Sequence, residues 1–224
     1  SDDFKKYFAG THFFNPVRYL PLLEIIPTQH TDKDVVDFYM SYGAKFLGKT
    51  TVEAKDTPAF IANRIGVFGI MNIFNNIQKL GLNISDVDKL TGPVIGRPKS
   101  ATFRTADVVG LDTLVHVANG VFNSGIEQDM FKDQFAMPDY INFLMENKFL
   151  GSKSGQGFFK KIKNADGSSE ILRLNLDTKE YESQGKVGFA TLELTKMIDK
   201  PIDRFKVLIG GKDKAGEFYR ARNT

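Results

Sequence analysis

The segment from Ala59 to Leu80 predicts a long helix that is apolar on nearly every side. Its large apolar residues recur at too many positions to share one face: Phe60, Ile61, Ile65, Val67, Phe68, Ile70, Met71, Ile73, Phe74 and Ile77. Such a helix is buried, or it is shared between two packed bodies. Pro58 precedes it, and proline favours a helix start because its missing N–H would be unpaired there. We therefore expect the chain to be organised around this helix, with a boundary at Asp56-Thr57-Pro58.

Short extended runs and one amphipathic helix precede this boundary. The expected elements are strands over residues 11–16 and 20–26, a helix from the cap at Thr31-Asp32-Lys33-Asp34 to Gly48, and a strand over 50–54. Pro16 and Pro21 interrupt the first two runs, which favours edge or bent strands over a helix. Residues 1–57 therefore read as the end of an α/β domain whose beginning is absent.

Helices dominate after the boundary. They are expected over residues 85–90 with Ser85 as cap, over 100–122 with a weak point at Gly110, and over 138–147. Two or three more helices are expected between residues 189 and 224, and the second of these begins at Pro201. Between them lie a glycine-rich loop at 151–157, strands at 158–161 and 171–176 joined by a turn at 164–167, and a linker-like stretch at 178–186.

The expected fold is therefore mainly α with a small α/β remnant. We divide the chain into residues 1–57, residues 58–162 as a helical domain, and residues 163–224. The last part holds a hairpin, a linker and the start of a second helical unit.

Composition excludes several classes of protein. The 30 basic and 27 acidic residues give a net charge of +3, which is too balanced to indicate a nucleic-acid partner. The absence of cysteine excludes disulfides, thiolate catalysis and cysteine metal sites. No apolar run reaches the ~18 residues of a membrane span, and Ser1 to Gly10 is unlike a signal peptide. We expect a cytoplasmic protein, or part of one.

One histidine and one glutamate form a candidate catalytic pair. His12 lies in Gly10-Thr11-His12-Phe13-Phe14-Asn15-Pro16, and Glu24 follows in the next apolar run. Two adjacent strands could bring them together, and a carboxylate beside an imidazole fixes its tautomer and stabilises the imidazolium. A histidine can act as a base at cellular pH. The alternative, which spacing alone favours, is a core histidine near an unrelated strand glutamate.

Two further polar positions are candidates for binding. Asn63 lies within the apolar helix, where a buried amide needs partners, so it could contact a substrate or cap a neighbouring loop. Arg97 and Lys99 precede a helix expected to begin near Ser100, where free N–H groups favour anions such as phosphates. The alternative there is a capped helix start with solvated cations.

Other patterns do not indicate a site. The loop from Gly151 to Gly157 lacks the order of residues of a phosphate-binding P-loop. His30 and His116 have no partners at metal-ligand spacing, so no metal site is predicted. No G-x-G-x-x-G follows a strand, so the main dinucleotide-binding motif is absent from this chain.

Several motifs, in register over residues 4–161, together resemble the 3-hydroxyacyl-CoA dehydrogenases. They are Gly10 to Pro16, Leu22-Leu23-Glu24, Lys55 to Pro58 with Phe60-Ile61-Ala62-Asn63-Arg64, Val109 to Thr113, and Gly151 to Lys160. Arg97-Pro98-Lys99-Ser100-Ala101-Thr102-Phe103-Arg104 is similar to a run in long bacterial chains that join this enzyme to an enoyl-CoA hydratase.

The resemblance implies a function for each candidate residue. It makes His12 the catalytic base, Glu24 its partner and Asn63 a substrate contact. It implies NAD-dependent oxidation of 3-hydroxyacyl-CoA to 3-ketoacyl-CoA in fatty-acid β-oxidation. The NAD would bind mainly to an N-terminal Rossmann domain, and a homo-oligomer would form through the helical domain. The chain departs from the family in lacking the Rossmann core with its glycine motif and a substrate-contacting serine, and in having Ala59 where glycine is common.

These departures leave other functions open. The fragment alone is expected to be inactive. One alternative is a non-catalytic helical module for dimerisation or substrate binding, acting through the apolar segment from Ala59 to Leu80. Another is a different NAD-linked reductase with a related helical domain, although the His12 and Glu24 pair argues against those that use a catalytic lysine.

Overall fold

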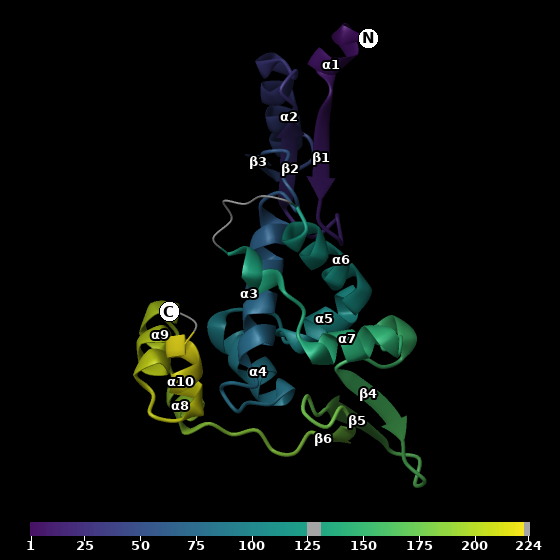
Figure 1. Cartoon of the computed structure of the whole chain (residues 1–224). Helices are drawn as coiled ribbons and strands as arrows, with labels where there is room; N and C mark the ends of the chain where they lie inside the picture. Colours follow the sequence, from purple (N-terminus) through teal and green to yellow (C-terminus); the bar gives the residue numbers. More distant parts are fainter. Residues whose placement is uncertain (125–130, 222–224) are drawn as a thin grey trace. The chain divides into compact units, whose positions relative to one another are not determined.

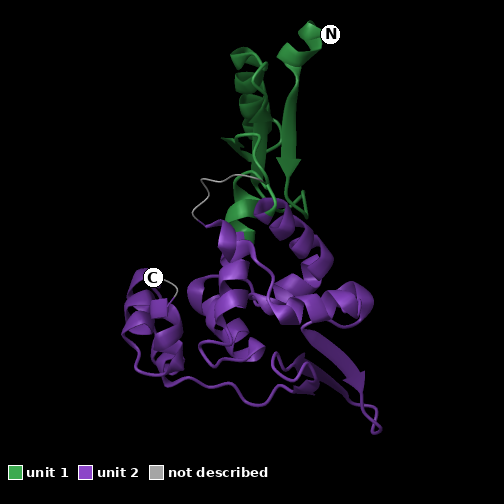
Figure 2. Ribbon diagram, viewed as in Figure 1, with its two compact units in different colours: residues 1–67, 123–126 green, residues 68–122, 127–224 purple. Residues whose placement is uncertain are grey.

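A computed structural model describes residues 1–124 and 131–221 of the chain. It divides into two compact units, residues 1–67 with 123–126 and residues 68–122 with 127–224 (Figure 2). Helices prevail over two small three-stranded sheets (Figure 1), which confirms the expected mainly α fold with a small α/β part. Within the described ranges, no helix has the length and apolar character needed to cross a membrane. The division into residues 1–57, 58–162 and 163–224 stays a prediction.

The first unit is built on a sheet whose strand order is β1-β2-β3. Its elements are α1 (Asp2–Tyr7), β1 (Ala9–Phe13), β2 (Leu22–Pro27), α2 (Lys33–Lys45) and β3 (Thr50–Glu53). β1 runs antiparallel to β2, whereas β3 runs parallel to it because α2 forms the crossover between them. The N-cap residue of α2 is Asp32, which lies within the capping segment predicted at Thr31 to Asp34. The short helix α1 was not predicted.

The core of the first unit lies between the sheet and α2. Leu23 and Ile25 of β2 pack with Val36 of α2, and all three are buried. Gly43 allows the helix to approach the strands closely, because a Cβ there would lie 2.5 Å from Cγ2 of Thr51. This packing makes β2 the central, best-buried strand of the sheet, with four consecutive buried residues.

The long apolar helix is shorter than predicted. α3 spans Ala62–Asn76, because Ala59 and Phe60 adopt left-handed backbone conformations with φ of 63° and 48°. A right-handed helix cannot include such residues, so the chain turns before the helix begins. The helix is also not buried on all sides, since Ile65 is 67% exposed.

The remaining helices of the second unit follow the predicted order. They are α4 (Ile84–Thr91), α5 (Phe103–Val109), α6 (Leu111–Phe122) and α7 (Asp139–Glu146), with a 3-10 turn, η1 (Pro93–Ile95), after α4. Gly110 separates α5 from α6 with a φ of 98°, so the predicted weak point is a break. Asn83, and not Ser85, caps α4, because Asn83 and Asp86 form a reciprocal capping box.

Four aromatic rings form the centre of the second unit. The rings of Phe74 and Phe103 stack at 5.0 Å between centroids, and Phe158 meets Phe103 edge to face at 4.7 Å. Tyr140 completes the cluster and donates its hydroxyl hydrogen to the carbonyl of Phe74 at 2.7 Å. This cluster joins α3, α5 and α7 to the residue that precedes the second sheet.

The second sheet and three helices complete the unit. They are β4 (Phe159–Lys163), β5 (Ser169–Leu174), β6 (Tyr181–Ser183), α8 (Ala190–Thr195), α9 (Pro201–Gly210) and α10 (Lys214–Ala221). β6 lies in the stretch predicted as a linker and pairs antiparallel with β5. Pro201 is the first residue of α9, as predicted. The last predicted helical stretch reaches Thr224, but residues 222–224 lie outside the described part.

Candidate active site

His12 and Glu24 lie directly opposite each other in the ladder between β1 and β2. Opposite residues in an antiparallel pair project from the same face of the sheet, so their side chains meet. The Nδ1 atom of His12 lies 2.7 Å from Oε2 of Glu24. The strand register thus brings His12 and Glu24 together, as the hypothesis of a catalytic pair requires.

The two side chains differ strongly in exposure. The side chain of Glu24 is completely buried, whereas that of His12 is 28% exposed. A buried carboxylate needs several donors, because an unpaired charge in the interior is costly. His12 can therefore reach a bound molecule, while Glu24 acts only through its neighbours.

The start of α3 supplies the other donors to Glu24. The backbone N–H groups of Ile61 and Ala62 donate to Oε1 at 3.1 and 2.8 Å. Ala62 is the first residue of α3 and Ile61 directly precedes it, at a helix start where unpaired N–H groups and the helix dipole favour negative charge. Glu24 therefore accepts three hydrogen bonds, two from the helix start and one from the imidazole.

This geometry determines the tautomer of His12. An ionised carboxylate can only accept hydrogen bonds, so the proton of the neutral ring lies on Nδ1. The Nε2 atom then carries a free lone pair. Chemically, the arrangement is that of a general base whose orientation a buried acid maintains.

Two aromatic rings that sequence reasoning missed surround the imidazole. Phe14 meets the ring of His12 edge to face at 4.6 Å between centroids, and Phe60 lies at 5.5 Å. Phe60 reaches this position from the left-handed turn before α3. The available signal was its place three residues before Asn63, but these residue types do not indicate the left-handed turn itself.

Asn63 follows directly after the two residues whose N–H groups bind Glu24. It lies in the first turn of α3 and is half-buried. The structure therefore places its backbone next to the hydrogen-bonded pair.

The start of α5 is capped, which was the alternative to an anion site at Arg97 and Lys99. The helix begins at Phe103 rather than near Ser100, and its N-terminus is already occupied. The carboxylate of Asp88 accepts hydrogen bonds from the N–H groups of Thr102, Phe103 and Arg104 at 3.0, 2.6 and 3.1 Å. Those N–H groups are therefore not free to bind a phosphate. Burial raises the pKa of Asp88 to about 6.

Metal ligands are not clustered in the part of the chain that the structure describes. There, no group of three or more histidine or acidic residues is arranged to hold a metal ion. His30 instead contacts Gln29 in an exposed turn.

Comparisons with known families match most of the chain. Residues 3–57 match the family described as 3-hydroxyacyl-CoA dehydrogenase, NAD binding domain. Residues 60–161 match the family described as 3-hydroxyacyl-CoA dehydrogenase, C-terminal domain. The two matched regions meet at the turn that contains Pro58 and Ala59.

Individual proteins show the same similarity. A probable 3-hydroxyacyl-CoA dehydrogenase of Bacillus subtilis is 47% identical over 96% of this chain, which covers 26% of that protein. One of Deinococcus radiodurans is 47% identical over 73% of this chain, covering 46% of that protein. The crystal structure of M. tuberculosis FadB2 is 31% identical with a TM-score of 0.60, covering 68% of this chain and 51% of that one. The chain thus spans between a quarter and a half of the length of these curated relatives.

Proposed function

Because the chain belongs to the 3-hydroxyacyl-CoA dehydrogenase family, we propose that its full-length protein oxidises (S)-3-hydroxyacyl-CoA to 3-ketoacyl-CoA with NAD. This chain supplies the base of that reaction. The observation that carries the proposal is the 2.7 Å contact between His12 Nδ1 and the buried carboxylate of Glu24. The reaction belongs to fatty-acid β-oxidation.

His12 takes the proton of the substrate hydroxyl on its Nε2 atom as the alcohol becomes a ketone. The free lone pair on Nε2 and the partial exposure of the side chain support this role. Proton transfer to a positioned base contributes ~10²–10⁴ in rate. Phe14 and Phe60 limit the directions from which water can approach the ring.

Glu24 positions His12 and offsets the charge that the imidazole gains. It touches no substrate because its side chain is fully buried. Its second oxygen is fixed by the N–H groups of Ile61 and Ala62, so the carboxylate cannot rotate away from the ring. A base whose partner is itself anchored keeps its orientation through the reaction.

Asn63 helps to orient the substrate. Its amide can both donate and accept hydrogen bonds, as recognition of a thioester or hydroxyl group requires. Its position in the first turn of α3, next to the residues that bind Glu24, supports this role.

NAD requires residues beyond this chain. The sequence has no glycine-rich turn between a strand and a helix that could approach a pyrophosphate closely. The residues present therefore do not form a cofactor site by themselves, and the rest of the Rossmann domain would hold NAD. For this reason the isolated chain is expected to be inactive.

Three further properties belong to the same proposal. We place the full-length protein in the cytoplasm and expect a homo-oligomer. The length of the Bacillus subtilis relative supports additional domains, among which an enoyl-CoA hydratase is our expectation.

An assay of the natural longer chain tests the proposal. Loss of NADH absorbance would be followed with acetoacetyl-CoA, and with acetoacetate to detect a reductase that needs no CoA. We expect turnover of the CoA substrate only, a loss of ~10²–10⁴ in kcat for His12→Ala, and normal rates for the control His30→Ala. Equal rates for wild type and His12→Ala would refute the role of His12. Absence of any rate would favour the non-catalytic module.

A further inference from the structure

A cavity of about 710 Å³ lies wholly within the second unit. Its walls come from α4 and η1, from the loop before α5 and Arg104 of α5, from β4, from the segment that links β6 to α8, and from α8 and α9. Sites for small molecules typically have volumes of roughly 300–1,000 Å³. The cavity is therefore large enough for a ligand, and nothing in the proposed dehydrogenase reaction uses it.

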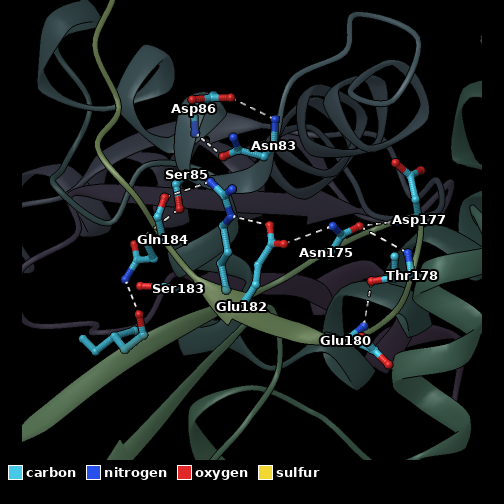
Figure 3. Close-up of polar contacts among 12 residues, drawn as sticks. Asn83, Ser85, Asp86, Asn175, Asp177, Thr178, Glu180, Glu182, Ser183 and Gln184 are labelled. Atoms are coloured by element: carbon cyan, nitrogen blue, oxygen red, sulfur yellow. Dashed lines mark hydrogen bonds and ion pairs between the residues drawn. The ribbon is translucent and has the colours of Figure 1, made fainter.

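Gln184 fixes the linking segment as one wall of the cavity. Its Oε1 atom accepts hydrogen bonds from Ser85 Oγ at 3.3 Å and from Arg104 Nη2 at 3.1 Å. Its Nε2 atom donates to the carbonyl of Ile171 at 2.7 Å. Arg173 also donates to the Gln184 carbonyl and to Glu182 Oε1, both at 3.0 Å. Figure 3 shows Gln184, Ser85 and Glu182 within this network of polar contacts. The wall is thus anchored at both its side chain and its backbone.

The cavity is lined by five basic and two acidic side chains. Both acids are already engaged. Glu193 forms an ion pair with Lys196, and both oxygens of Asp88 accept hydrogen bonds from N–H groups at the start of α5. Arg204 is engaged too, since it donates to the carbonyls of Val94 and Ile198. With five basic and two acidic side chains, the lining keeps a net charge of +3, although Asp88 also interacts electrostatically with Arg104.

The remaining cations are Lys89, Lys99 and Arg104. In the described part of the chain, neither lysine has an acidic partner within ion-pair distance, and both residues are exposed. The guanidinium of Arg104 lies 4.2 Å above the ring of Phe159, which holds its plane in place. Only its Nη2 atom has a hydrogen bond in the described structure, so the other nitrogens can donate to a ligand.

We propose that this cavity binds a small organic phosphate. A phosphate group presents several oxygens with a charge of up to two, which suits two lysines and one arginine better than a single carboxylate does. The apolar residues Phe159, Val187 and Phe189 line the rest of the cavity and would contact the organic part. Gly185 and Gly188 leave room at the wall, because a Cβ on either would meet no atom within 4 Å.

Titration of this chain by two-dimensional amide NMR tests the site, with ADP, inorganic pyrophosphate and adenosine as probes. ADP and pyrophosphate are expected to shift the amides of Gly185, Val187 and Gly188, and adenosine is not. Removal of two cations in Lys89→Gln/Lys99→Gln should weaken ADP binding at least tenfold. The matched control, Arg97→Gln/Lys186→Gln, removes the same charge from residues near the cavity that do not line it, and should change affinity less than twofold.

Each outcome of the titration either supports the phosphate site or overturns it. Saturable shifts at the linking segment that depend on Lys89 and Lys99 support the site. Equal weakening by the control pair would mean attraction to the general charge of the surface, and would overturn it. The site is also overturned if no probe shifts these amides, or if adenosine alone does. None of these results depends on dehydrogenase activity.

Discussion

Glu24 accepts hydrogen bonds at the same time from His12 and from the first turn of α3. The imidazole binds one carboxylate oxygen at 2.7 Å, and the N–H groups of Ile61 and Ala62 bind the other. A single buried residue therefore connects the candidate base to the start of the helix that carries Asn63. A substitution that moves the start of α3 should therefore change the orientation of His12, and a substitution at His12 should affect the start of α3.

Replacement of Glu24 by glutamine should reduce kcat of the longer chain by ~10²–10⁴ while changing KM little. The glutamine oxygen can still accept from the helix start, but its NH2 group would face Nδ1 and favour the opposite tautomer of His12. Steady-state kinetics with acetoacetyl-CoA would measure this. Glu53→Gln on the exposed part of β3 is the matched control, and an equal loss there would contradict the role of Glu24.

Replacement of Ala59 by glycine should stabilise the chain slightly. Ala59 has a φ of 63°, and this left-handed conformation costs roughly 1–2 kcal/mol for a residue with a Cβ. Glycine removes that cost but loses about 0.4–1 kcal/mol through the greater entropy of the unfolded chain. Urea unfolding should therefore show a small gain, whereas Ala44→Gly in α2 should lose about 0.5–1 kcal/mol. A loss of similar size at Ala59 would show that its backbone is not left-handed.

Removal of the Tyr140 hydroxyl should destabilise the second unit. In Tyr140→Phe, the carbonyl of Phe74 loses a donor in the aromatic core, and a buried acceptor without a partner costs about 1–3 kcal/mol. Thermal or urea unfolding would measure the change. Tyr42→Phe in the exposed part of α2 is the control and should not change stability. If Tyr140→Phe were as stable as Tyr42→Phe, the hydrogen bond from Tyr140 to the Phe74 carbonyl would not stabilise the unit.

The stability difference between wild type and Asp107→Asn should depend on pH. Burial raises the pKa of Asp107 from 3.8 to about 6, against the lowering effect of N–H donors from Phe158 and Phe159. The native state therefore binds more protons than the unfolded state between these values, so this contribution to stability is complete below about pH 4 and is lost as pH rises through 6.

Urea unfolding of both proteins from pH 4 to 7.5 checks this prediction. Wild type should lose stability relative to Asp107→Asn up to about pH 6, with no further change above it. A relative gain for wild type over that range would mean that the hydrogen bonds outweigh burial and lower the pKa of the carboxyl.

Residues with strong local preferences made much of the fold predictable. The cap within Thr31 to Asp34 and the helix start at Pro201 were confirmed, whereas the weak point predicted at Gly110 is a complete break between two helices. β6 could not be predicted in this way. It is only three residues long, polar, and exists because Leu172 to Leu174 of β5 pair with it.

The candidate site was only partly predictable. The order of His12 and Glu24 indicated a pair, but only the strand register brings them face to face. The N–H donors of Ile61 and Ala62 depend on the left-handed turn at Ala59 and Phe60, which residue types do not reveal. A capped start was one alternative for the helix after Lys99, but Asp88 could not be identified as the capping residue because it comes from another helix.

The tautomer of His12 decides whether its Nε2 atom can act as the base. Two-bond ¹H–¹⁵N correlation spectra of this chain near neutral pH distinguish the protonated ring nitrogen from the free one. The account predicts a proton on Nδ1 and a free Nε2 in wild type, and loss of this preference in Glu24→Gln. A proton on Nε2 in wild type would contradict it, because His12 could then not accept a proton from a substrate at that atom.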